Sequence, residues 1–154
     1  MKNYELVYVE PKPMNYEKRS VFDYDILFQA QHEKGYKVLI VNYFTHPCAY
    51  IGLQDSHPYW RSDYDLLNDI SCHGGITYSG DHHSRVKELC DNGWFIGWDY
   101  SHWNDYMYYY LPEDGLEFTK KWTTEEIIAE CEQVIEQLEN VKRKAYKEEN
   151  NDNS

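Results

Sequence analysis

Residues 36–44 read YKVLIVNYF and form the most sustained apolar stretch of the chain, with four consecutive aliphatic residues at positions 38–41. Gly35 precedes the stretch and marks a break before it. A short continuous apolar run bounded by a turn signal is typical of a strand that is buried on both faces. We therefore predict a central strand of a sheet here. The run is far too short to cross a membrane.

Further strands are expected on either side of this stretch. Residues 4–10 combine aromatic and β-branched side chains and end at Pro11 and Pro13, which cannot donate to a ladder. Residues 49–53 resemble a shorter neighbour of the central strand, and residues 76–78 and 94–98 are two later candidates that could pair with each other. Residues 21–30 fit both a helical stripe and strand alternation, so that element stays open.

Two helices are expected. Ser62 and Asp65 have the spacing of a capping box for a short helix whose Leu66, Leu67 and Ile70 would face inward. A second capping box, Thr123 and Glu126, precedes apolar residues that recur every three or four positions and define one helical face. These residues are Ile127, Ile128, Cys131, Val134, Ile135, Leu138 and Val141.

Together these elements predict an α+β domain over residues 1–146, with a mixed or mainly antiparallel sheet of about five strands covered by a long C-terminal amphipathic helix. Residues 147–154 read KEENNDNS, which is too polar to bury anything, and predict a disordered tail. A chain of 154 residues suits one hydrophobic core.

The charge balance limits the classes of partner. Fifteen basic residues against 27 acidic ones give a formal net charge of −12, which repels phosphate backbones and anionic membranes. We therefore expect neither direct nucleic-acid binding nor membrane association. The excess is largest over residues 71–119, whose net charge is −6. Such a segment suits a cation or a basic protein surface, although a merely solubilising surface is the commoner reason for acidity.

The four cysteines, Cys48, Cys72, Cys90 and Cys131, contain no C-x-x-C pair, and the first residues have no apolar stretch of the signal-peptide type. We expect reduced thiols and a cytoplasmic location. A buried small hydrophobe is the better interpretation of all four. Cys72, beside His73, is the one thiol worth testing for reactivity.

Glycine, histidine and aspartate are concentrated in residues 71–105, which read SCHGGITYSGDHHSRVKELCDNGWFIGWDYSHWND. Gly74 and Gly75 allow backbone conformations that could present amides to an anion or a ligand carbonyl, and His73 and Thr77 flank them. A glycine turn that simply enters a strand explains the pair equally well.

Asp99, His102 and Asp105 follow the strand predicted at 94–98 at intervals of three residues. Carboxylate and imidazole groups suit a divalent metal ion, or a general base oriented by an acid. Taken singly, such residues are more often loop caps and solvated surface, so the hypothesis depends on their convergence. Pairing of the strands at 76–78 and 94–98 would bring His73 or Thr77 close to Asp99.

The blocks HGGITY (73–78) and GWDYSHWND (97–105) resemble a set of small uncharacterised proteins encoded by phages and prophages. In that set an HGG[IL]T[YF] block precedes a G[FW]DxxHxxD block, and the likeness extends over residues 49–138. Tyr100, Ser101, Trp103 and Asn104 stand where smaller residues are expected. The resemblance implies a mobile-element origin and supplies no activity.

Two functions from different classes follow. In the first, His73, Gly74, Gly75, Thr77, Asp99, His102 and Asp105 form a pocket for a small polar or nucleotide-like ligand. Asp99, His102 and Asp105 would be the ligands of a divalent metal ion. Sequestration or metal-assisted hydrolysis of a host signalling nucleotide, a counter-defence activity, would fit a phage context.

In the second, the acidic, tyrosine-rich surface mimics nucleic acid or covers a basic host protein. The sequence has no P-loop, HExxH or GxSxG motif, so it leaves open whether the protein is an enzyme. It also does not indicate an oligomeric state.

Overall fold

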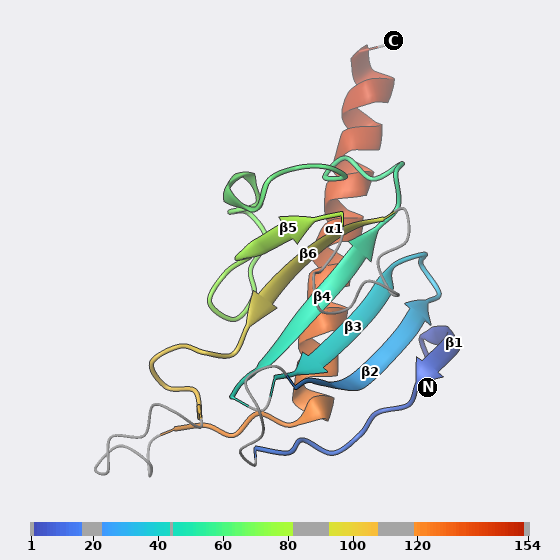
Figure 1. Cartoon of the computed structure of the whole chain (residues 1–154). Helices are drawn as coiled ribbons and strands as arrows, with labels where there is room; N and C mark the ends of the chain where they lie inside the picture. Colours follow the sequence, from blue (N-terminus) through green and yellow to red (C-terminus); the bar gives the residue numbers. More distant parts are fainter. Residues whose placement is uncertain (1, 17–22, 44, 82–92, 108–118, 153–154) are drawn as a thin grey trace.

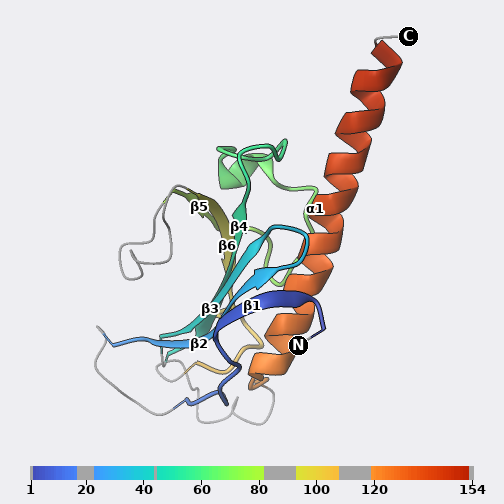
Figure 2. The ribbon, with the colours of Figure 1, turned by 90° about the vertical axis from the view of Figure 1, so that its right-hand side faces the viewer.

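The structure, a computed structural model, describes residues 2–16, 23–43, 45–81, 93–107 and 119–152. An antiparallel sheet of six strands forms one layer, and one long helix packed on a single face forms the other (Figures 1 and 2). The α+β prediction is therefore confirmed. The elements are β1 (Tyr4–Val9), β2 (Asp25–His32), β3 (Lys37–Asn42), β4 (Pro47–Leu53), the 3-10 turn η1 (Tyr64–Leu66), β5 (Tyr78–Gly80), β6 (Trp94–Asp99) and α1 (Thr124–Asp152).

The strands lie in the order β1-β2-β3-β4-β6-β5, and every neighbouring pair is antiparallel. The first four form a meander, and the chain then places β6 beside β4 with the short β5 at the edge. The expected partnership of the two later strands is present, since Tyr78 pairs with Gly97. β5, however, spans Tyr78–Gly80 rather than residues 76–78, although the N–H of Thr77 already donates to the carbonyl of Gly97 in β6 at 2.9 Å.

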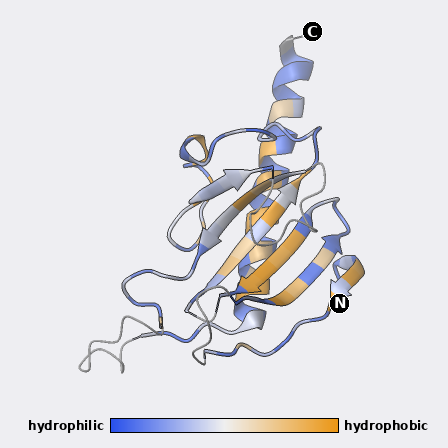
Figure 3. Cartoon of the chain, viewed as in Figure 1, coloured by the Kyte–Doolittle hydropathy of each residue, from blue (hydrophilic) through white to orange (hydrophobic). Residues whose placement is uncertain are grey.

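β3 is the buried central strand that its sequence predicted. Val38 and Ile40 belong to the main core beneath α1, whereas Leu39 and Val41 belong to a second cluster on the opposite face. All four side chains are at most 2% exposed. Apolar colour is accordingly concentrated in β2, β3 and β4 (Figure 3). A strand packed on both faces has no need of polar alternation, which explains the continuous run.

Two glycines on the second face make room for aromatic rings on the neighbouring strand. Tyr50 of β4 is paired with Gly97 of β6, and Phe95 of β6 is paired with Gly52 of β4. A Cβ atom added at Gly97 would lie 2.6 Å from the Tyr50 ring, and one at Gly52 would lie 3.0 Å from the Phe95 ring. Rings that cover glycine backbone in this way fix the register of the two strands.

The capping box predicted for α1 is formed. The backbone N–H of Glu126 donates to Thr123 Oγ1 at 3.2 Å, and the N–H of Thr123 donates to Glu126 Oε1 at 3.1 Å. The predicted apolar face is the buried one. Ile127, Cys131, Val134, Ile135 and Leu138 are each at most 1% exposed.

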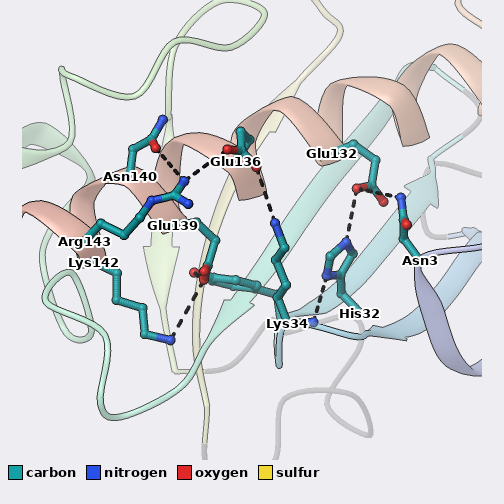
Figure 4. Close-up of polar contacts among 10 residues, drawn as sticks. Asn3, His32, Lys34, Glu132, Glu136, Glu139, Asn140, Lys142 and Arg143 are labelled. Atoms are coloured by element: carbon teal, nitrogen blue, oxygen red, sulfur yellow. Dashed lines mark hydrogen bonds and ion pairs between the residues drawn. The ribbon is translucent and has the colours of Figure 1, made fainter.

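Carboxylates at the margin of this helical face hold the β2–β3 hairpin against α1 (Figure 4). Glu132 lies 3.1 Å from the Nε2 atom of His32, a side chain that is 2% exposed. The hydroxyl of Tyr36 donates to Glu139 at 2.6 Å. Lys34 is 3.4 Å from Glu136. The helix is therefore fixed by polar contacts at its edges as well as by its apolar face.

The structure resolves the open element at residues 21–30 and corrects two predictions about the short helix near residue 65. The open element at 21–30 is a strand from Asp25 onward, because both of its faces find apolar partners within the sheet. Ser62 does not cap the short helix, since the N-cap is Asp63 and makes no side-chain hydrogen bond there. Leu66 is 71% exposed, whereas Leu67 and Ile70 are buried as predicted. A single 3-10 turn is too short to direct all three side chains inward.

The disordered tail predicted from residue 147 is also corrected, because α1 continues to Asp152. Its last turns extend beyond the sheet (Figures 1 and 2). Polar composition there predicts the lack of burial correctly, but lysine and glutamate are good helix formers and need no packing partner to continue a helix. Within the described part of the chain, no helix has the length and apolar character needed to cross a membrane.

Candidate functional site

The predicted site residues come together where β6 ends and α1 begins. Asp99 is the last residue of β6, and the N–H of His73 donates to Glu130 of α1 at 3.1 Å. The loop after β6 is tied to the segment before the helix, since Asp105 forms a parallel bridge with Lys120. Residues that are far apart in the sequence therefore share one end of the sheet.

Asp105 is the buried centre of this cluster, with a side chain that is 2% exposed. Its Oδ2 atom lies 2.7 Å from His73 Nε2 and accepts the N–H of His102 at 2.9 Å. Its Oδ1 atom accepts the indole N–H of Trp122 at 2.8 Å. Because both oxygens have donors, the carboxylate is hydrogen-bonded without water. We therefore assign the His73 tautomer that carries its proton on Nε2.

Aromatic rings hold the imidazole of His73 in place. The Tyr100 ring is stacked on it, with centroids 4.9 Å apart and an interplanar angle of 8°. Trp122 and His102 approach it edge-on at 4.9 and 5.3 Å. The His73 side chain remains 23% exposed, and its Nδ1 atom has no hydrogen-bond partner among the described residues. That nitrogen is then the acceptor available to a ligand.

Glu130 links this cluster to the core. Its Oε1 atom accepts the hydroxyl of Tyr100 at 2.7 Å as well as the N–H of His73. The Tyr100 oxygen accepts in turn the indole N–H of Trp98 at 3.0 Å. Burial, followed by the hydrogen bond to Glu130, raises the pKa of Tyr100 far above its usual range, so this hydroxyl stays protonated.

Asp99 and His102 form a second acid–imidazole pair beside the first. His102 Nε2 is buried 3.4 Å from Asp99 Oδ1, an ion-pair distance, but makes no hydrogen bond with any residue that the structure describes. Asp99 Oδ1 accepts the Ser101 hydroxyl at 2.6 Å, and Thr77 donates to Asp99 Oδ2 at 3.4 Å. Burial raises the pKa of Asp99, but the Ser101 hydrogen bonds and the nearby histidines lower it to below its ordinary value.

The two glycines have different roles. The N–H of Gly75 donates to the carbonyl of Cys72 at 3.0 Å, which closes a β-turn with Gly74 at its third position and a φ of 72°. That position favours glycine. A Cβ atom at Gly74 would lie 1.9 Å from His102 Nε2, whereas one at Gly75 would have no atom within 4 Å. Gly74 therefore admits the His102 ring, and Gly75 borders open space.

The described residues do not contain a complete set of ligands for the predicted metal ion. No three His, Cys, Asp or Glu side chains within the described ranges are arranged to hold a metal ion. Both oxygens of Asp105 are already engaged by protein donors, His73, the N–H of His102 and Trp122. Asp99 and His102 are the two predicted ligands that remain close together. A divalent ion at this site stays a prediction.

The thiols that the structure describes show no feature of a catalytic cysteine. Cys48, Cys72 and Cys131 form no disulfide bond. Burial, with Glu130 nearby, raises the pKa of Cys72 to about 12, so its thiolate is scarce at neutral pH. Cys90 lies outside the described residues.

Three residues that the sequence patterns do not single out, Tyr100, Trp122 and Glu130, lie against His73 or hold the segment that carries it. Tyr100 stands within the second block, where its size is its one distinguishing feature. Trp122 directly precedes the capping box, and Glu130 is a carboxylate at the margin of an apolar helical face. The last feature is a usable signal, because a partly buried glutamate requires a donor.

Comparisons with protein-family models, with curated proteins and with solved structures each gave no match. The geometry of the His73 cluster is therefore the basis for assigning a function. Two surface depressions, of about 460 Å³ near Gly52 and 790 Å³ beside Tyr59 and Gln137, lie away from the His73 cluster.

Proposed function

We propose that this protein binds a small polar or nucleotide-like ligand beside the Gly74–Gly75 turn, and that His73 contacts the ligand through Nδ1. The observation that carries the proposal is the Asp105–His73 pair. A carboxylate that is 2% exposed and fully hydrogen-bonded orients an imidazole that is still 23% exposed. Burying a carboxylate is costly, and orienting a histidine toward a ligand is a common use of such a pair.

Three neighbouring features favour a ligand over a purely structural role. Gly75 leaves space that a side chain would occupy. Trp103, on the loop between His102 and Asp105, is 91% exposed and offers a flat apolar surface on which a base or another ring can stack. Asp99 is ionised at neutral pH and can accept from ligand hydroxyl or amino groups.

Whether the site needs a cation depends on whether the ligand carries a negatively charged group such as a phosphate. An anionic ligand beside Asp99 would meet a like charge, and a divalent ion held by Asp99 and His102 would offset it. With such an ion, His73 could serve as the general base for hydrolysis. Without one, the protein would sequester its ligand. The likeness to phage-encoded proteins favours a host signalling nucleotide as the ligand, and the free thiols suit the reducing cytoplasm of a host cell.

Thermal melts in the presence of mononucleotides and cyclic dinucleotides, each with and without magnesium, manganese or zinc, test the proposal. A ligand at a hundredfold over its dissociation constant should add about 2.7 kcal/mol to the free energy of unfolding. His73→Ala and Trp103→Ala should abolish the response. Trp103 is exposed, so its replacement should leave the unliganded melting temperature unchanged.

Tyr64→Ala is the matched control, because Tyr64 is also exposed, at 50%, but belongs to η1. It should retain the full response. If no ligand shifts the parent, or if His73→Ala keeps the response, the His73 cluster is a structural clamp and the binding proposal fails.

A second candidate function, inhibition of a basic host protein, is favoured by the loop between β4 and β5. Asp55, Asp63, Asp65 and Asp69 are exposed there, and Arg61 is the single basic residue of residues 54–70. An inhibitor of this kind would lose affinity on Asp63→Asn and Asp65→Asn and not on His73→Ala. The ligand-binding function predicts the opposite pattern, so co-purification from host lysate with both variants separates the two.

A further inference from the structure

α1 is much longer than the sheet that it covers. Its 29 residues correspond to about 40 Å at 1.5 Å per residue, whereas strands of 6 to 8 residues measure roughly 20–27 Å. The C-terminal part of α1 therefore continues past the end of the sheet (Figures 1 and 2).

The helical face that packs on the sheet continues into this outer part. Positions four, seven, eight and eleven after the buried Leu138 lie on the same face of a helix, and they hold Lys142, Ala145, Tyr146 and Glu149. Tyr146 is 67% exposed. We call these four residues the outer face of α1. In the described part of the chain, no strand or second helix covers it.

The charges of the outer face are arranged for self-recognition. Lys142 and Glu149 are seven residues apart, on either side of the small Ala145 and the aromatic Tyr146. In a helix pair that runs antiparallel about a two-fold axis at residues 145 and 146, Lys142 of each copy faces Glu149 of the other. The same axis places the two Tyr146 rings together and the two small alanines at the close approach of the helices.

Lys142 is available for such a partner. Its Nζ atom lies 3.9 Å from Glu139 of its own helix, the longest of the ion pairs of α1, and its side chain is 43% exposed (Figure 4). Exposed pairs of this kind contribute little to stability and are easily exchanged. Glu149 follows a segment, residues 142–147, that holds four of the 15 basic residues and no acidic one. Residues 142–149 of α1 are thus basic at their N-terminal end and acidic at their C-terminal end. An antiparallel copy places the acidic end of one helix beside the basic end of the other.

We propose that two copies of this chain pair through the outer face of α1. A nucleic acid is the rival occupant, but the net charge of −12 and the presence of Glu149 on the same face as Lys142 oppose it. A contact of two helical turns per copy is smaller than a standard interface. The dimer is therefore weak and in exchange with monomer, and it becomes weaker as salt screens the exposed charges. This proposal is independent of the ligand site.

Sedimentation equilibrium of the full chain over a range of concentrations and at two salt concentrations measures the pairing. The parent should dimerise, more strongly at low salt. Lys142→Glu and Glu149→Lys should each weaken the dimer by roughly tenfold or more, because each reversal brings two like-charged pairs into contact across the axis. The double variant restores opposite charges and should recover most of the parent affinity.

Lys147→Glu is the matched control. It has the same charge change on the same helix but lies about 100° round the helix from Tyr146, outside the four positions of the outer face, so it should have a smaller effect than either reversal on that face. The proposal is overturned if the parent is a monomer at every concentration, or if the double variant is no better than the single ones. Binding of a labelled oligonucleotide by the parent, lost on Lys142→Glu, would identify the rival occupant instead.

Discussion

Gly74 and His102 are so closely packed that a single added carbon atom cannot be placed between them. A Cβ at Gly74 would lie 1.9 Å from His102 Nε2. The contact ties the turn before β5 to the loop after β6, and through that loop to Asp105 and His73. Gly75, which follows directly, also has a positive φ but has no atom within 4 Å of an added Cβ. Comparing the two glycines therefore separates the effect of backbone strain from that of the contact with His102.

Gly75→Ala should cost about 1–2 kcal/mol of unfolding free energy, the ordinary penalty of a left-handed conformation for a residue with a side chain. Gly74→Ala has the same backbone penalty and must also displace the His102 ring, so it should cost distinctly more. Urea unfolding measures both. Equal costs for the two variants would mean that His102 is free to move away and does not lock the loop.

Ile135 tests the packing of α1 on the sheet. Its side chain is 1% exposed, so Ile135→Asp would bury a carboxylate with no partner and should cost several kcal/mol. The neighbouring Gln133 is exposed, and Gln133→Asp should change the melting temperature by no more than a degree or two. If the two variants melt alike, the apolar face of α1 is not the packed face.

The elements that the sequence predicted well are those specified by neighbouring residues. The run at 38–41 needs only its own hydrophobicity to become a central strand, and the capping box of Thr123 and Glu126 needs four consecutive residues. The ambiguity at 21–30 had a different cause. A strand with one bulge, such as the one between Ile26 and Phe28, interrupts strict alternation and imitates a helical stripe.

The residues proposed for the site stand in two short blocks of the sequence, whereas the residues that support His73 do not. His73 depends on Trp122 and Glu130, which lie 49 and 57 residues further along the chain, and no local pattern reports a contact at that distance. The helical tail has the converse explanation. The polar composition of residues 147–152 predicts disorder, whereas exposure and helix formation are independent when the residues are good helix formers.

The three thiols that the structure describes should be slow to react in the folded protein. Cys48 and Cys131 are buried, and burial raises the pKa of the half-buried Cys72 to about 12, so almost no thiolate is present at pH 7 to 8. In a Cys90→Ser variant, titration with a thiol reagent should find little fast reaction in the folded protein, and the parent should show four thiols after denaturation without reductant. A thiol that reacts at once in the folded protein and is lost on Cys72→Ser would contradict this assignment.

The last prediction concerns acid stability and His57, which joins the loop after β4 to α1. Its side chain is 5% exposed. Its Nδ1 atom accepts the N–H of Tyr59 at 3.0 Å, so Nε2 carries the proton and donates to the Leu138 carbonyl at 2.9 Å. A second proton would have to displace the Tyr59 donor from Nδ1.

Burial lowers the pKa of His57 below its ordinary value of 6.5, and the hydrogen bond to Leu138 opposes that effect only in part. In the unfolded chain the imidazole takes up its proton near pH 6.5, whereas in the folded protein it does so at a lower pH. Between these two pKa values the unfolded state therefore binds more protons than the folded protein does. The contribution of His57 to stability is complete above pH 6.5 and is lost as the pH falls below 6.5.

For one group the loss is at most about 1.4 kcal/mol per pH unit. Urea unfolding of the parent between about pH 7.5 and 5, from roughly one unit above the unfolded pKa to roughly one and a half units below it, should show this decline. His57→Gln can still donate to Leu138 but cannot titrate, so its curve should be flatter below pH 6.5 whatever its stability at neutral pH. Parallel curves for the two proteins would mean that His57 is protonated equally in the folded and unfolded states, and that its buried hydrogen bonds do not select the neutral ring.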